Sequence, residues 1–155
     1  MIVVADTSPI NYLVLIDEIE LLPQIFGNVL VPNAVWTELK AEGSPQAIKD
    51  WIATDPHWVN IETPTSIDTS IRLGIGEIEA ISLAKERNAD LVLIDDRKAR
   101  LAAIDRGLGV AGTVNILEIA SKRGLIDLAI TFQALQRTNF RITLKLLDEI
   151  LQRNR

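Results

Sequence analysis

The sequence lacks cysteine and has a single histidine, His57, among its 155 residues. The absence of cysteine excludes disulfides, thiolate metal sites and thiol nucleophiles. A catalytic triad or zinc site that depends on histidine could use His57 alone, and Asp55 is its only helpful acidic neighbour. We therefore expect His57 to be a surface or turn residue, and any metal ligands to be oxygen atoms.

Aromatic residues are also scarce, and the chain has no net positive charge. Aromatics make up 5% of the chain and hydrophobic residues 48%, so the interior must consist mainly of Leu, Ile, Val and Ala. The formal net charge of −5 argues against a protein that binds nucleic acid with its whole surface. A net negative charge is still compatible with an enzyme whose acidic residues are gathered around a cation.

Long hydrophobic runs are absent as well, since none approaches the roughly 20 apolar residues that cross a membrane. The N-terminal MIVVA has no basic region and is too short for a signal peptide. We expect a cytoplasmic protein with no membrane partner. The length is that of one ordinary domain, so a single domain over residues 1–155 is expected.

Short apolar runs alternate with amphipathic stretches along the chain. This alternation predicts an α/β domain in three layers, with a central parallel sheet, helices on both faces and further helices at the C-terminus. Ser8 and Asn33 are expected to cap helices, and Gly76 to open one. The expected strands cover 2–5, 29–31, 58–61 and 91–94. The main expected helices cover 8–16, 19–27, 33–39, 77–87, 97–106, 113–124, 127–137 and 142–153.

Acidic residues follow two of the expected strands directly. Asp6 comes after the first strand, and Asp95 and Asp96 come after the strand at 91–94. Ligands of such sheets bind outside the carboxyl ends of the strands, so these carboxylates should lie at one edge. The alternative is that each caps the helix that follows it, where negative charge is favoured.

Two glutamates are placed near the same edge. Glu38 lies in the second turn of the helix after the second strand, where the alternative is a solvated helix face. On a helical wheel, Glu77 lies at the centre of an apolar face and Glu79 points almost the opposite way. A carboxylate in the first turn of an apolar face either caps the helix or is directed at a site.

Convergence of these carboxylates would require a cation among them. Unit charges about 4 Å apart repel by roughly 4 kcal/mol per pair at an effective dielectric of 20. Oxygen ligands suit Mg²⁺ or Mn²⁺, ions that activate water and neutralise charge on a phosphodiester. Arg97, Lys98 and Arg100 follow on the next helix, where phosphate could lie, although Arg97 and Lys98 also suit a solvated surface.

The ordered motifs resemble the PIN-domain family of metal-dependent ribonucleases. The segments that carry the resemblance are VADTSPINYL, VLVPNAVWTEL, LGIGEIEAISLAKE, LVLIDDRKARLAA and GVAGTVNILEIASKRGLI, with TNFRITLKLLDEIL in keeping. They span nearly the whole chain and are most similar to a bacterial and archaeal subgroup often regarded as toxins of toxin–antitoxin pairs. The resemblance implies a PIN-like fold.

The resemblance also implies roles for individual residues. It makes Asp6, Glu38 and Asp95 metal ligands and places Glu77 at the third acidic site, where many members have Asp. Ser8, beside Thr7, would support Asp6, and Arg100 would pair with a site carboxylate. The neighbours Asp96 and Glu79 leave the register open, so Asp96 is a further candidate ligand and Glu79 a supporting residue.

The leading hypothesis is a Mg²⁺- or Mn²⁺-dependent endoribonuclease that cleaves the phosphodiester bonds of single-stranded RNA and is restrained as a toxin by a cognate antitoxin. The resemblance implies a homodimer, for which the C-terminal helices are plausible surfaces. One alternative is a Mg²⁺-dependent phosphohydrolase, but a dehalogenase-type phosphatase would have Asp where this chain has Ser8. Another is a catalytically silent PIN-like protein that binds RNA or protein, which the filled acidic positions do not favour.

Overall fold

Five short strands form one parallel sheet in the order β3-β2-β1-β4-β5. The computed structural model describes residues 1–155. Each strand is followed by at least one helix, as parallel connections require. The strands are β1 (Val3–Ala5), β2 (Val29–Pro32), β3 (Val59–Glu62), β4 (Leu91–Leu93) and β5 (Val110–Ala111).

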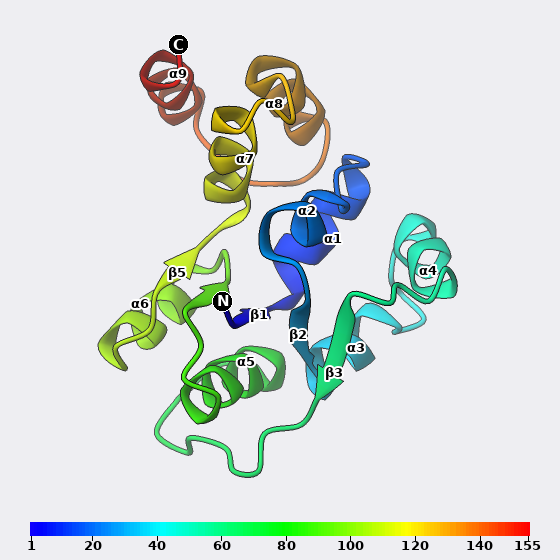
Figure 1. Ribbon diagram of the computed structural model, residues 1–155, viewed down its shortest axis with the longest axis vertical. Coiled ribbons are helices and arrows are strands. Elements are labelled where there is room, and N and C mark those ends of the chain that lie inside the picture. Colours follow the sequence, from blue (N-terminus) through cyan, green and yellow to red (C-terminus); the bar gives the residue numbers. More distant parts are fainter.

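Nine helices surround the sheet, and the last three form a lobe beyond its end, at the top of Figure 1. None of them is both long and apolar enough to span a membrane. The helices are α1 (Thr7–Leu15), α2 (Leu21–Phe26), α3 (Asn33–Leu39), α4 (Gln46–Ala53), α5 (Ile75–Glu86), α6 (Arg97–Asp105), α7 (Thr113–Lys122), α8 (Leu128–Gln136) and α9 (Leu144–Arg153).

Both faces of the sheet are buried, which explains the unbroken apolar character of its central strands. Side chains alternate along a strand, so Val3 and Ala5 of β1 join the larger core with α1, α7 and α8. Val4 points the other way, into a smaller core with Ala80 of α5 and Ala99 of α6. The three layers and the central parallel sheet predicted from the sequence are confirmed.

The strand order changes direction between β1 and β4. From β1 the chain moves to β2 and β3 on one side, and later to β4 and β5 on the other. Ala5 pairs with Leu93, and the backbone N–H of Asp6 donates to the carbonyl oxygen of Leu93 at 2.9 Å. Such a reversal leaves a crevice beyond the strand ends, where α/β proteins bind ligands.

Three expected helix starts are wrong by one or two residues. The cap of α1 is Asp6 rather than Ser8, the cap of α3 is Pro32 rather than Asn33, and α5 begins at Ile75 after Gly74 rather than at Gly76. In the first two cases the cap stands at the strand end, since Pro32 is the last residue of β2 and Asp6 directly follows β1, and both still have an extended backbone.

Glu79 also differs from the expectation. Helix α5 is buried on most sides, so the side of the helix opposite Glu77 is not a solvent side. Glu79 is 9% exposed and accepts a hydrogen bond from the backbone N–H of Ala34 at 3.0 Å. It therefore anchors the first turn of α3, the helix that carries Glu38.

Removal of the Glu79 carboxylate should destabilise the fold through α3. Glu79→Ala leaves the N–H of Ala34 without its acceptor, which costs about 1–3 kcal/mol when the group is kept from water. Glu79→Gln keeps an acceptor oxygen and should cost clearly less. Urea unfolding of the two variants measures the difference, and equal losses would contradict this role for Glu79.

Candidate functional site

A pocket of about 840 Å³ lies at the crevice between the ends of β1 and β4. It brings together the five carboxylates and the two hydroxyl residues, Thr7 and Ser8, that were predicted from the sequence, whereas Glu79 and the three predicted basic residues do not line it. Its lining is Asp6, Thr7, Ser8, Asn11, Tyr12, Glu38, Gly74, Ile75, Gly76, Glu77, Asp95, Asp96, Asn139, Phe140 and Arg141.

Asp6 is the most deeply buried of these carboxylates, with 5% of its surface exposed. Although it is the N-cap residue of α1, its side chain makes no capping hydrogen bond, and no cation pairs with it. Burial raises its pKa to about 7, and the charges of Glu77, Glu38 and Asp95 add to the rise, against a lowering by the Thr7 N–H. Capping alone therefore does not explain Asp6.

Asp95 lies next to Asp6 but has a fully supported carboxylate. Its Oδ2 accepts from the hydroxyl groups of Ser8 at 2.8 Å and Thr113 at 2.7 Å, and its Oδ1 accepts from the Thr113 N–H at 2.7 Å. The predicted support of Asp6 by Ser8 is wrong, because the α1 turn directs this hydroxyl toward β4. Asp95 consequently joins α1, β4 and α7.

Glu38 reaches the pocket from α3 and is oriented by Thr7, whose hydroxyl donates to its Oε2 at 3.0 Å. Gly76 makes this approach possible. A Cβ at Gly76 would lie 3.0 Å from Glu38 Oε2 and 3.7 Å from Asp6 Oδ1. The absence of a side chain on α5 thus leaves room for two carboxylates that come from different elements.

Glu77 and Asp96 line the pocket and also act as helix caps. Glu77 accepts from the N–H of Gly74 at 3.3 Å, and Asp96 accepts from the N–H of Ala99 at 3.0 Å. The pKa of Glu77 is raised by burial and by the charges of Asp96 and Glu38, although the Gly74 N–H lowers it. For these two residues the capping interpretation is correct, alongside their place at the pocket.

The three predicted basic residues lie on α6, away from the carboxylate pocket. Arg97 and Lys98 are exposed. The predicted pairing of Arg100 with a site carboxylate is wrong, because its guanidinium donates to the carbonyl of Ile94 and to Asn115 Oδ1, each at 3.4 Å. Arg97 and Arg100 line a second pocket that adjoins the first.

Several residues of the site were missed by the sequence analysis. Thr113 is fully buried and holds Asp95, and its position as the first residue after a glycine at a strand end was a usable signal. The wall formed by Asn139, Phe140 and Arg141 lies in the segment TNFRITLKLLDEIL, where nothing local indicated a contact with α1, which is far away in the sequence. The Tyr12 hydroxyl donates to Asn139 Oδ1 at 2.8 Å and so fixes that wall against α1.

The carboxylates surround the pocket without enclosing a common point. No group of three or more Asp, Glu or His side chains lies close enough together here to hold a metal ion. The donor set itself matches a hard divalent cation, since it consists of carboxylates and hydroxyls without histidine or cysteine. Asp6, buried and without a cation partner, is the residue that such an ion would neutralise.

The pH dependence of stability should reveal the raised pKa of Asp6. Its folded value of about 7 exceeds the ordinary 3.8, so between these values the folded state holds the proton that the unfolded state releases. The free energy of unfolding in EDTA should therefore fall as pH rises from about 4 to 7, by up to about 1.4 kcal/mol per pH unit from this group. Asp6→Asn should flatten that fall in urea titrations, and identical pH profiles would contradict the assignment.

Comparison with known proteins places this geometry in a family. A family model described as a PIN domain matches residues 2–155. No curated protein matches the chain. A PilT N-terminus domain protein from the hyperthermophilic archaeon Sulfolobus solfataricus has a similar structure, with a TM-score of 0.51, 18% identity and coverage of 75% of this chain and 90% of that one. That likeness supports the PIN-like fold. Because the family model spans nearly the whole chain, the protein belongs to the PIN-domain family, whose members are generally metal-dependent nucleases.

Proposed function

We propose that this protein is a divalent-metal-dependent endoribonuclease that hydrolyses RNA phosphodiester bonds. The single observation that carries the proposal is the buried carboxylate of Asp6, which has no cation partner and lies in a pocket with four further acidic residues. A fold retains such repulsion where a cation or a reaction makes use of it. Membership of a nuclease family supports the same reaction class.

The ligands in this proposal are Asp6, Glu38 and Asp95, with Glu77 as the further acidic residue, and binding requires these side chains to draw closer together around the ion than they lie here. A bound Mg²⁺ or Mn²⁺ would supply an activated water and neutralise the charge that develops on the phosphodiester. The protein itself orients the ligand carboxylates. Thr7 holds one oxygen of Glu38, and Ser8 with Thr113 holds both oxygens of Asp95, so neither carboxylate can rotate freely.

Loss of any one ligand should abolish most of the activity. Asp6→Asn, Glu38→Gln and Asp95→Asn should each lower RNA cleavage by more than the roughly 10- to 100-fold that follows loss of a ligand's outer partners. Glu79→Gln is the matched control, since this carboxylate is on α5 but outside the pocket. Cleavage of labelled single-stranded RNA with Mg²⁺ or Mn²⁺ measures the rates.

Two controls test whether RNA cleavage depends on the metal and whether the protein binds the metal without cleaving RNA. Activity of the pure protein that persists undiminished in EDTA would overturn the metal dependence. Mn²⁺ should raise the melting temperature of the unaltered protein by mass action and leave that of Asp6→Asn nearly unchanged. A metal response without any RNA cleavage would instead support the alternative of a silent PIN-like binding protein.

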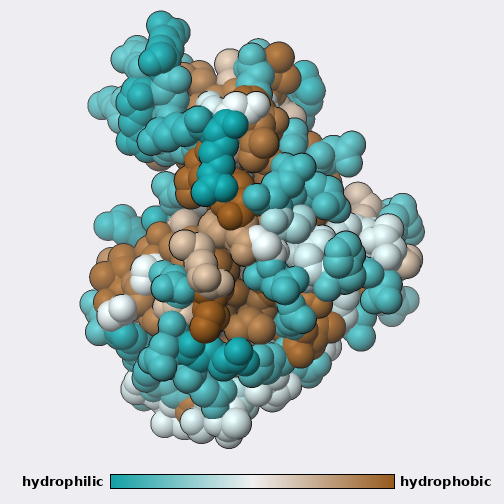
Figure 2. All heavy atoms as spheres, viewed as in Figure 1, coloured by the Kyte–Doolittle hydropathy of each residue, from teal (hydrophilic) through white to brown (hydrophobic).

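We further propose that the enzyme is a toxin, that it forms a homodimer, and that an antitoxin restrains it. Exposed apolar side chains support protein contacts, among them Leu144 and Leu146 of α9, which are 69% and 44% exposed. Figure 2 shows another hydrophobic area over α6 and β5, and Leu101 and Ile104 of α6 are about half exposed. The acidic pocket would suit an Arg or Lys side chain offered by the partner.

Co-expression with any small protein that is encoded beside this gene tests the restraint. The neighbour should co-purify with the chain and suppress RNA cleavage, and removal of the neighbour should restore cleavage. A neighbour that neither binds nor inhibits would remove the toxin assignment while leaving the nuclease assignment intact. Light scattering of the chain alone at several concentrations reports whether it dimerises.

A further inference from the structure

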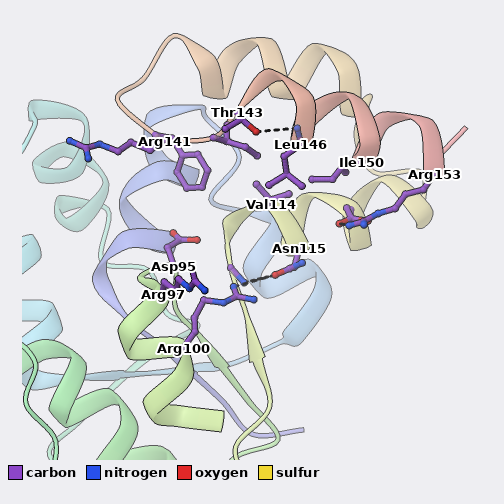
Figure 3. A pocket seen from close by; sticks show the side chains of 14 residues that line it. Asp95, Arg97, Arg100, Val114, Asn115, Arg141, Thr143, Leu146, Ile150 and Arg153 are labelled. Carbon is purple, nitrogen blue, oxygen red and sulfur yellow. Dashed lines mark hydrogen bonds and ion pairs between the residues drawn. The ribbon is translucent and has the colours of Figure 1, made fainter. Parts of the chain in front are cut away.

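A second pocket of about 830 Å³ opens directly beside the carboxylate pocket. It lies between α6 on one side and the segment that leads into α9 on the other, and Figure 3 shows Arg97 and Arg100 facing Thr143 and Leu146 across it. Asp95, Phe140 and Arg141 line both pockets. The two pockets therefore adjoin and share a wall.

The charge of this second pocket is opposite to that of the first. Four arginines and two carboxylates line it, whereas five carboxylates and one arginine line the first. Arg153 pairs with Glu118 at 2.5 Å, which removes one charge of each sign. Arg97, Arg100 and Arg141 have no carboxylate within ion-pair distance. Three arginines beside the acidic site thus have no carboxylate partner, although the Arg100 guanidinium also donates to Ile94 and Asn115.

The floor of the second pocket is apolar. It is formed by Val114, Phe140, Ile142, Leu146 and Ile150. A nucleobase that has left its stack can rest on such a surface while arginines hold the adjacent phosphates. A duplex presents phosphates outward and keeps its bases stacked, so it gains nothing from an apolar floor. The combination favours a single strand.

We infer that the second pocket holds the nucleotides that flank the cleaved bond of a single-stranded RNA. Arg141 binds the phosphate at the junction of the two pockets, and Arg97 and Arg100 bind the next phosphates along the strand. This inference rests on the proposed nuclease function and adds to it the path of the substrate.

The position of Arg141 supports its role at the junction. In Figure 3 its side chain extends away from Arg153, which lies at the far end of the second pocket. Its neighbour Phe140 packs edge-on against Tyr12 of α1 with ring centroids 4.9 Å apart, and Tyr12 also bonds to Asn139. The backbone that carries Arg141 is therefore held in place, although the side chain itself is exposed.

Binding of a labelled single-stranded RNA of about ten nucleotides, a length within the usual range of single-strand sites, tests the inference. Fluorescence anisotropy with the full chain in EDTA avoids cleavage. Arg141→Gln and Arg97→Gln should each weaken binding roughly five- to tenfold and lower the slope of log affinity against log salt by about 0.7. Arg123→Gln is the matched control, since this exposed arginine lies outside both pockets.

Cleavage assays with Mg²⁺ complete the test. Arg97→Gln should raise KM for the long RNA more than it lowers kcat, because this residue lines the second pocket and not the carboxylate pocket. Unchanged binding and KM in both variants, with the unaltered protein still active, would overturn the inference and leave the nuclease assignment standing. Equal affinity for the duplex of the same sequence would overturn the single-strand assignment. Absence of cleavage by the unaltered protein would overturn the nuclease assignment and this inference with it.

Discussion

Strands β1 and β4 pair in parallel with Ala5 opposite Leu93, and the backbone N–H of Asp6 extends that ladder by one further hydrogen bond. This pairing brings Asp6 and Asp95 to the same edge of the sheet, at the point where the strand order reverses. It also brings Ser8 into contact with Asp95, although the two residues are 87 positions apart in the sequence. The remaining features of the site depend on this edge, because α1, α5 and α7 are positioned by the strands that flank it.

The two central aspartates show how the fold distributes the cost of like charges. Asp95 has both oxygens held by hydroxyl and N–H donors, so its orientation is set. Asp6 is almost as buried as the apolar core residues. Its pKa is raised because burial disfavours the ionised form. One carboxylate thus supplies rigidity, and the other is left for a cation to stabilise.

Local charge matters more here than the net charge of the chain. A net charge of −5 gives no general attraction for RNA. The acidic pocket nevertheless adjoins a pocket lined by four arginines, and the wall at Phe140 and Arg141 belongs to both. A polyanion can therefore be held beside the carboxylates by a few contacts, without a basic surface over the whole molecule.

The sequence by itself determined the alternation of strands and helices, the oxygen-only donor set, and the presence of acidic residues at the ends of β1 and β4. These follow from local periodicity and from residue types, which need no knowledge of distant contacts. The acidic edge was predictable because the carboxyl ends of parallel strands must meet.

Only the tertiary structure decided which groups contact one another across that edge. Ser8 supports Asp95 rather than Asp6 because the first turn of α1 directs its hydroxyl toward β4. Glu79 is buried because α5 packs against α3 on the side that a helical wheel leaves free. Tyr12 meets Asn139 across 127 residues, and that contact fixes the wall that carries Arg141. Such partners are set by the packing of whole elements, and no local pattern in the sequence records them.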